Sequence, residues 1–330
     1  MLRRITRRQF ITCMSSVTAA AALPARGQRT SVRTIGYLDA GSRASRSGLI
    51  APFLKGLAEL GYVENKNLII EYRWGGGQFE RLPQLAADLV RQHVALIAAF
   101  PAPAALAAKA ATTEIPIVFM SGPNPVTNGL VSSLRRPGGN VTGVTTITSE
   151  LAPKRLQLLR DIAPKAVGFA FLVNSRNPRA KPDTEEVRAA ARLAGEQVLE
   201  IGAATLSEIQ TALGTFAQQR VGALLIGADP YFYSVRKELA EVTTRYSMPA
   251  IFSEREYAAA GGLMSYGASL DDAHYRVGRL VGRILNGDRP IDLPVQQPLK
   301  FELVINLRAA RAIGINLPET LLLRADEVIQ

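Results

Sequence analysis

The stretch RRPGGNVTGVTTI, residues 135–147, interrupts a regular alternation of strand and helix patterns along the chain. One proline and two glycines favour a turn, and the β-branched run after them is typical of a strand. The alternation precedes this stretch and starts again after it. Because alternating strands and helices build a parallel sheet covered by helices, the sequence predicts two α/β lobes of similar size, with residues 141–147 leaving the first sheet.

Short apolar runs predict the strands of each lobe. In the first lobe they lie at 34–38, 68–74, 95–100 and 115–120. In the second lobe they lie at 167–173, 197–203, 221–227 and 249–252. Helices are expected at 46–60, 79–91, 103–111, 126–135, 150–162, 183–195, 206–219 and 234–246. The rest of the chain adds an apolar run at 261–267, a long amphipathic helix at 270–286, a strand-like run at 296–307 and a helical segment at 307–313.

Residues 1–27 have the pattern of an export signal. The pair Arg7-Arg8 stands before Gln9, no acidic residue occurs in this part of the chain, and a short apolar run precedes Ala25-x-Gly27. These features are typical of a secretory signal, and the arginine pair resembles the bacterial twin-arginine signal. An ordinary secretory signal with a chance second arginine is the alternative. The apolar run is too short to span about 30 Å of hydrocarbon, so we expect the protein in the periplasm.

Charge argues against a nucleic-acid partner. The chain has 39 basic and 28 acidic residues, but five of the basic residues lie in the predicted signal, so the remainder is only moderately basic. The densest remaining basic clusters, Arg135-Arg136 and residues 176–181, have no aromatic residues interleaved with them. A nucleic-acid footprint combines clustered basic residues with aromatic platforms, so we expect none here.

The scarcity of cysteine and histidine argues against metal and catalytic sites. The only cysteine is Cys13, inside the predicted signal, and the two histidines, His93 and His274, lie far apart in the sequence. No glycine-rich phosphate or dinucleotide fingerprint follows a predicted strand. Residues 263–267 lack the first glycine of a G-x-S-x-G nucleophile elbow. We therefore expect no metal, no cofactor and no catalytic residues.

The loops after the predicted strands are the candidate binding surface, because open parallel sheets bind ligands beyond the carboxyl ends of their strands. Small, polar and proline residues gather in these loops, as expected for a cleft in which both lobes supply hydrogen bonds. The loops lie at 39–42, 74–77, 100–103 and 121–125 in the first lobe, and at 174–178, 227–230 and 253–254 in the second. Ser42, Asn124 and Asp229 have a second interpretation as helix N-caps, which does not exclude contact with a ligand.

Seven stretches, in order, resemble the periplasmic substrate-binding proteins of ABC importers related to the TrpX type, which binds tryptophan or tyrosine. They cover most of the chain after the predicted signal, and the ordered set is more specific than any one of them. The stretches are ELGYVENKNLIIEYRW (59–74), IPIVF (115–119), GLVSSLRRPGGNVTGV (129–144), LVNSRNP (172–178), ADPYF (228–232), GGLMSYG (261–267) and QQPLKFELVINLRAARAIGINLP (296–318).

The resemblance implies a type I periplasmic-binding fold, in which two doubly wound, Rossmann-like lobes are joined by three crossover strands. Residues 28–145 and 265–295 are then expected to form the first lobe, and residues 146–264 and 296–330 the second. It also implies a monomeric solute-binding component that closes its lobes on a small molecule, like a Venus flytrap, and hands it to an ABC permease in the inner membrane. Hinge closure of this kind is typical of periplasmic binding proteins.

The resemblance also suggests which residues contact the ligand. Asp229 and Asn174 keep the family pattern, and we expect Asp229 to bind a protonated amino group, since charge-assisted hydrogen bonds are the stronger ones. The chain departs from the family at Pro123-Asn124-Pro125, where relatives often have Gly-Asp-Pro, and at residues 100–103. The expected ligand is an amino acid, an aromatic acid or a related carboxylate. The expected ligand-binding residues are Ser42, Phe100, Asn124, Asn174, Asp229 and Tyr266.

Two other functions are compatible with the same sequence. An exported ligand-sensing partner of a receptor would have the same fold, so residue patterns do not separate it from a transport protein. An exported enzyme would agree with a twin-arginine signal, since that pathway carries folded proteins. The enzyme reading lacks an acid–base cluster, a dinucleotide fingerprint and cysteine ligands, so the sequence favours a binding protein.

Overall fold

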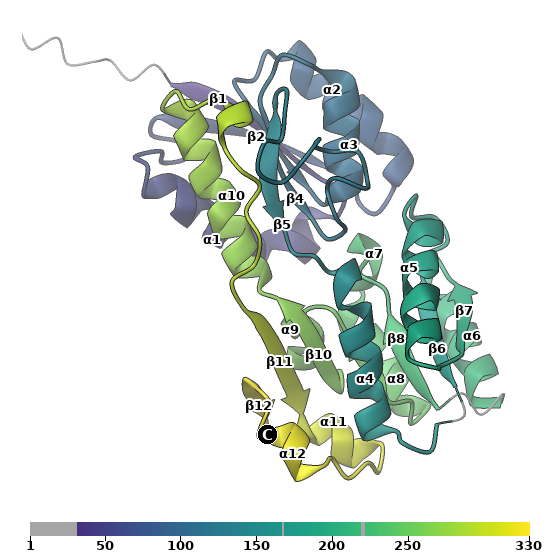
Figure 1. Cartoon of the computed structure of the whole chain (residues 1–330). Helices are drawn as coiled ribbons and strands as arrows, with labels where there is room; N and C mark the ends of the chain where they lie inside the picture. The colour runs from purple at the N-terminus through teal and green to yellow at the C-terminus, as the bar shows by residue number, and fades with distance from the viewer. Residues whose placement is uncertain (1–31, 167, 219–221) are drawn as a thin grey trace, which may run out of the picture. The chain divides into compact units, whose positions relative to one another are not determined.

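The first lobe contains a five-stranded parallel sheet with the strand order β2-β1-β3-β4-β5 (Figure 1). The computed structural model describes residues 32–166, 168–218 and 222–330, so the predicted signal lies outside the described residues. All neighbouring strands of this sheet are parallel. The strands are β1 (Arg33–Asp39), β2 (Leu68–Trp74), β3 (Ile97–Phe100), β4 (Ile117–Ser121) and β5 (Val141–Thr145).

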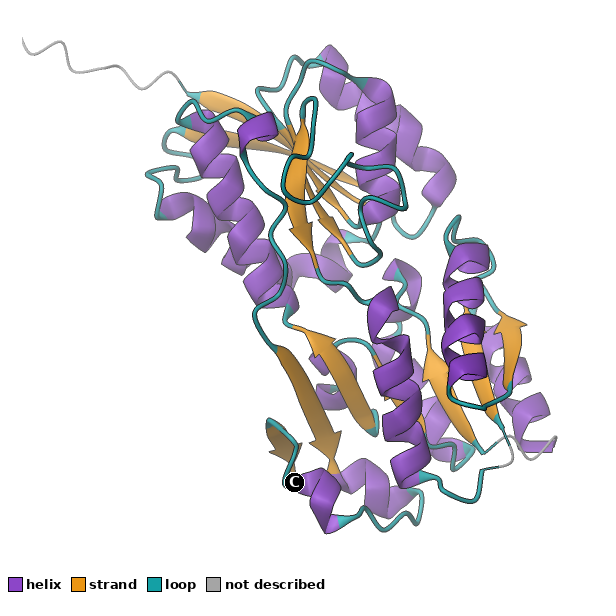
Figure 2. Cartoon of the chain, in the orientation of Figure 1, coloured by secondary structure: helices purple, strands orange, loops and turns teal. Residues whose placement is uncertain are grey.

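Helices cover both faces of this sheet because its strands are apolar on both sides (Figure 2). In β1, Ile35 and Tyr37 join the core under one pair of helices, whereas Leu38 joins the core on the other face. Alternate residues of a strand point to opposite faces, so one strand serves both cores. The first pair is α1 (Arg43–Ala58) with α10 (Leu270–Leu285), and the second is α2 (Leu82–Arg91) with α3 (Ala102–Ala111).

The second lobe contains a seven-stranded sheet with the order β12-β11-β10-β9-β8-β6-β7. All its neighbouring strands are parallel except β10 and β11. Its strands are β6 (Phe169–Val173), β7 (Val198–Gly202), β8 (Ala223–Ile226), β9 (Ala250–Phe252), β10 (Met264–Ala268), β11 (Phe301–Asn306) and β12 (Glu327–Ile329). Its helices are α4 (Ala152–Ile162), α5 (Ala180–Leu193), α6 (Leu206–Gln218), α7 (Pro230–Ser234), α8 (Arg236–Arg245), α9 (Arg255–Ala259), α11 (Leu307–Ala312) and α12 (Glu319–Leu322).

The chain passes between the two sheets three times. It leaves the first sheet after β5, returns after β10 to form α10, and enters the second sheet again at β11. Before that last passage, Gln296 pairs with β5: Thr145 N donates to the Gln296 oxygen, and Gln296 N donates to the Gly143 oxygen, each at 2.9 Å. Two doubly wound lobes joined by three crossings are what the family resemblance implies, and the structure has this arrangement. The lobe boundaries expected at 145/146, 264/265 and 295/296 stay predictions.

The helix expected at 126–135 is wrong, because turns occupy this segment. Gly129 has a φ of 77°, which belongs to the left-handed region and interrupts a right-handed helix. The Pro125 oxygen accepts hydrogen bonds from both Leu130 N and Val131 N, at 2.9 and 3.1 Å. Ser133 Oγ donates to the Arg136 oxygen at 2.9 Å, a local bond that competes with helical pairing.

No helix among the described residues has the length and apolar character needed to cross a membrane.

The contact between α1 and α10 yields a matched pair of glycine variants in one helix. A Cβ added at Gly56 would lie 2.1 Å from the backbone oxygen of Tyr275 in α10, whereas one added at Gly48 would meet no atom within 4 Å. Gly56→Ala is expected to lower the free energy of unfolding by about 1–3 kcal/mol, since it overpacks the helix contact. Gly48→Ala is expected to raise it by about 0.5–1 kcal/mol, because alanine favours the helix.

Urea denaturation followed by circular dichroism measures both variants. Equal shifts for the two substitutions would contradict the close α1–α10 contact.

Candidate functional site

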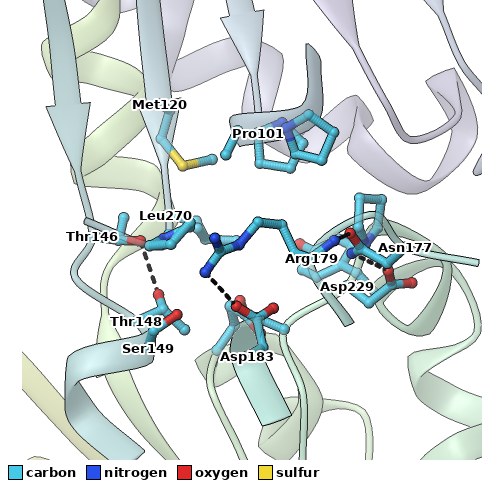
Figure 3. A pocket seen from close by; sticks show the side chains of 18 of the residues that line it. Pro101, Met120, Thr146, Thr148, Ser149, Asn177, Arg179, Asp183, Asp229 and Leu270 are labelled. Atoms are coloured by element: carbon cyan, nitrogen blue, oxygen red, sulfur yellow. Dashed lines mark hydrogen bonds and ion pairs between the residues drawn. The ribbon is translucent and has the colours of Figure 1, made fainter. Parts of the chain in front are cut away.

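A cavity of about 70 Å³ lies where the carboxyl ends of strands from both sheets meet (Figure 3). Both lobes belong to one compact unit, Val32–Gln330, and residues of both form the walls of the cavity. The first lobe supplies Arg46, Pro101, Ala102, Pro103, Met120, Gly122, Pro123 and Leu270. The connection after β5 supplies Thr146, Thr148 and Ser149. The second lobe supplies Asn177, Arg179, Asp183, Ala228, Asp229, Pro230, Tyr233 and Glu254. One water needs only about 10–15 Å³ by this kind of measure, so the cavity has room for a small organic group.

The Asp229 carboxylate joins two loops of the second lobe. It caps α7, where its Oδ1 accepts from Tyr231 N at 2.8 Å and Phe232 N at 3.1 Å. Asn174 Nδ2 donates to the same oxygen at 2.9 Å, and Asn177 Nδ2 donates to Oδ2 at 2.8 Å. Burial raises the pKa of Asp229, and these four hydrogen bonds offset part of that rise. Since Oδ2 has one of these donors and Oδ1 has three, Oδ2 retains acceptor capacity toward the cavity.

Arg179 extends across the cavity between Asp183 and the side formed by Met120 and Pro101 (Figure 3). Its Nη2 donates to Asp183 Oδ1 at 2.8 Å and to Glu186 Oε1 at 3.3 Å. Burial raises the pKa of Asp183 to about 6, and the charge of Arg179 offsets part of this rise. The Arg179 charge is therefore already matched by two carboxylates of its own helix, α5.

Arg46 and Glu254 also line the cavity. The sequence prediction missed Arg46, whereas Glu254 lies in the expected binding loop 253–254 but was not among the predicted ligand contacts. Arg46 lies in the first turns of α1 and is 6% exposed. It continues the apolar stripe of Leu49, Phe53 and Leu57 at spacings of three and four, and this pattern could have revealed it as inward-facing. Burial raises the pKa of Glu254, and a hydrogen bond from Ser253 Oγ offsets part of that rise.

Of the six predicted ligand-binding residues, Asp229 lines the cavity and Asn174 lies directly behind it as its hydrogen-bond donor. Ser42 caps α1, where its Oγ accepts from Ser45 N at 3.2 Å. Asn124 Oδ1 accepts from Val126 N, and its Nδ2 donates to Glu150, at 2.9 Å each. The N-cap interpretation therefore holds for Ser42 and Asp229, and Asn124 closes a local turn.

The structure does not bring the two predicted aromatic residues to the cavity lining. Phe100 is 1% exposed and stacks between Tyr37, at 4.7 Å, and His274, at 4.6 Å, measured between ring centroids. It thus belongs to the first-lobe core, and the residues just after it, Pro101 to Pro103, face the cavity instead. Tyr266 packs beside Phe301, with ring centroids 6.2 Å apart, in the second lobe.

Across the described ranges, no three His, Cys, Asp or Glu side chains gather in a way that could hold a metal ion. The chemistry of this cavity is that of hydrogen bonding and charge pairing beside an apolar wall of proline, methionine and leucine. Such a combination is typical of pockets that bind small amphipathic molecules.

Asp229→Ala is expected to lower the free energy of unfolding by about 2–4 kcal/mol, since α7 loses its cap and two buried amides lose their acceptor. Ser269→Ala is the matched cap variant, because in the described part of the chain Ser269 Oγ accepts only from Asp272 N, at 3.3 Å, in capping α10. Its expected cost is about 0.5–1 kcal/mol. Urea denaturation of both variants is the measurement, and similar costs would refute the central place of Asp229 in the loop network.

Asp183 predicts a pH-dependent stability. Its pKa of about 6 in the folded protein exceeds the ordinary value of about 3.9. The folded protein therefore holds a proton that the unfolded chain has released, and the stabilisation present below the ordinary pKa is lost as the pH rises through 6. Wild type should lose stability relative to Asp183→Asn between pH 4 and 7 in urea denaturation. Arg179→Met should extend the loss of stability to higher pH, because the Asp183 carboxyl then lacks the nearby positive charge. Parallel pH profiles for wild type and Asp183→Asn would contradict the raised pKa of Asp183.

Comparison with known proteins agrees with this architecture. The family described as ABC transporter substrate binding protein matches residues 40–329. A tyrosine-binding protein of Clostridioides difficile (strain R20291) is 28% identical over 263 residues, which are 80% of this chain and 75% of that protein.

Two solved structures have the same fold over most of the chain. A conserved domain protein from Vibrio cholerae has a TM-score of 0.83 and 26% identity, covering 90% of this chain and 99% of its own. The ABC domain in complex with L-Trp from Streptococcus pneumonia has a TM-score of 0.81 and 26% identity, covering 91% of this chain and all of its own. The expected type I periplasmic-binding fold is confirmed, and the family is one of binding proteins rather than enzymes. The chain belongs to the ABC transporter substrate-binding protein family.

Proposed function

We propose that this protein is the solute-binding component of an ABC importer, and that it binds an amino acid, an aromatic acid or a related small carboxylate in the cavity between its lobes. The observation that carries the proposal is the lining of the cavity, to which both lobes contribute loops at the carboxyl ends of their strands. A ligand held from both sides favours closure of the lobes, because it contacts both only in the closed arrangement.

The character of the walls supports this ligand class. Pro101 and Met120 form an apolar side, and Arg179, Asp183 and Asp229 lie across from it (Figure 3). Leu270, Arg46 and Glu254 also line the cavity. A ligand with a charged head group and an apolar side chain complements such a surface better than a sugar does, because a sugar needs hydrogen-bond partners for the hydroxyl groups all around its ring. The relatives named above, one called tyrosine-binding and one solved with L-Trp, support an amino acid as the first candidate.

The predicted export signal supports a periplasmic location, and the family supports delivery of the ligand to a permease in the inner membrane. We propose further that the protein acts as a monomer, with Asp229 as one ligand contact through its Oδ2 and Asn174 as the group that orients it. The remaining predicted contacts, Ser42, Phe100, Asn124 and Tyr266, lie outside the cavity lining, so we assign the ligand contacts to the lining residues instead.

A thermal-shift screen tests the binding function. Purified protein, unfolded and refolded to remove bound ligand, is heated with the twenty amino acids, aromatic acids, small peptides and sugars. A ligand at 100 times its dissociation constant adds about 2.7 kcal/mol of stability, which raises the melting temperature by several degrees.

The expected result is a clear shift with amino acids or aromatic acids, and mass spectrometry should recover the compound unchanged. A shift with sugars alone would contradict the ligand class. Conversion of the bound compound would contradict a pure binding function.

A further inference from the structure

The Arg46 guanidinium has no hydrogen-bonded carboxylate partner among the described residues. Its Nε is buried and has no hydrogen-bond partner among the described residues. The nearest carboxylate is Asp39, whose Oδ1 lies 3.8 Å from Nε, beyond hydrogen-bond distance. That oxygen already accepts from Gly41 N at 2.6 Å. Arg46 is therefore a cation at the cavity that still has hydrogen-bond donors available to a ligand.

Arg179, the second guanidinium at the cavity, also has a buried Nε without a hydrogen-bond partner among the described residues, but its charge is better balanced. Its Nη2 donates to both Asp183 and Glu186, so two carboxylates already balance its charge. Arg46 has one loosely placed carboxylate and donors to spare. A new anion in the cavity thus has more to gain from Arg46 than from Arg179.

Contacts from both lobes hold Arg46 in place. Asp39 belongs to β1 of the first lobe, whereas the ring of Tyr233, in α7 of the second lobe, lies 4.3 Å from the Arg46 guanidinium carbon. A cation over an aromatic face is stabilised, but the face accepts no in-plane hydrogen bond. The edge of the guanidinium therefore remains available for a planar anion such as a carboxylate, which it binds in a two-pronged geometry.

The charge of Arg46 persists in this setting. Burial lowers the pKa of the guanidinium, but the negative charge of Asp39 and the neighbouring Tyr233 and Glu254 raise it by more. A buried cation without full compensation is unfavourable for the fold, and a ligand anion would relieve that cost. Arg46 lines the cavity, and its Nε has no hydrogen-bond partner among the described residues.

We propose that Arg46 binds the carboxylate of the ligand and so makes the site select carboxylates over their uncharged amides. This inference rests on the proposed binding function. It goes further by naming the residue that selects the ligand's charged group and the contact that links that group to both lobes. Arg46 is then the specificity-determining residue for the acid group.

Calorimetric titration with matched pairs tests the proposal. The probes are L-tryptophan, L-tyrosine, L-leucine and benzoate, each with its primary amide, up to 10 mM at pH 7.5 and fixed ionic strength. Wild type should bind the best acid about tenfold or more tightly than its amide, as expected for a hydrogen-bonded charge pair. Arg46→Met should remove this preference, and Arg46→Lys should keep part of it, because lysine preserves the charge but not the two-pronged geometry.

The ratio of acid to amide affinity is the deciding readout, since a folding defect weakens both members of a pair alike. Arg46→Lys serves as the second variant if Arg46→Met does not fold, because lysine keeps a cation near the buried Asp39 carboxylate. Arg43→Met, an exposed arginine in the same helix, is the control and should leave the ratio unchanged.

Two outcomes overturn the proposal in different ways. If acids and amides bind wild type equally, or Arg46→Met keeps the preference, the role of Arg46 is wrong and the binding function stands. If none of the eight probes binds, both the role of Arg46 and the proposed ligand class are wrong.

Discussion

The close packing of α1 against α10 ties the first lobe to the chain segment that returns from the second lobe. Gly56 and Gly278 let the two helix backbones approach so closely that a Cβ on Gly278 would lie 2.1 Å from the Phe53 oxygen. Because α10 follows a strand of the second sheet, it reaches α1 only if the chain crosses back into the first lobe. The first residues of both helices, represented by Arg46 and Leu270, border the cavity. The packing that completes the first lobe therefore also places part of the binding site.

The charged groups of the cavity divide into those used by the fold and those left over. Asp229 holds a helix start and two asparagines, and Arg179 is paired with Asp183 and Glu186. Arg46 Nε has no hydrogen-bond partner among the described residues, whereas Oδ2 of Asp229 accepts from Asn177 and Glu254 accepts from Ser253, so both carboxylates keep further acceptor capacity. A ligand with one acidic and one amino group complements both sets. This division is an electrostatic argument for the amino-acid ligand that we propose, independent of what related proteins bind.

The fold could largely be predicted from the sequence because it depends on repeated local patterns. The apolar run at 68–74 coincides with β2, and the helix expected at 270–286 ends one residue from α10. The expected helix at 126–135 failed because a left-handed glycine and serine–backbone bonds override its apolar spacing. The three-residue strand β12 is too short to leave a periodic pattern, and only pairing with β11 defines it.

The site was less predictable, because it depends on which way individual side chains point. Asp229 could be found, since a carboxylate after a strand and before Pro230 marks a helix start at a ligand-binding edge. Phe100 is an expected ligand contact, but this last residue of a buried strand lies in the core, and Pro101 and Pro103 line the cavity instead. Arg46 was missed because a charged residue in a helix is ordinarily exposed. Only its spacing from the apolar residues of the same helix indicates that its side chain faces inward.

A crystal structure of the protein with its tightest-binding carboxylic acid is the most direct test of ligand binding between the lobes. We expect ligand density in the cavity, contacts from both lobes, and a carboxylate within hydrogen-bond distance of Arg46. Density outside the cavity, contacts from one lobe only, or a carboxylate turned away from Arg46 would contradict it.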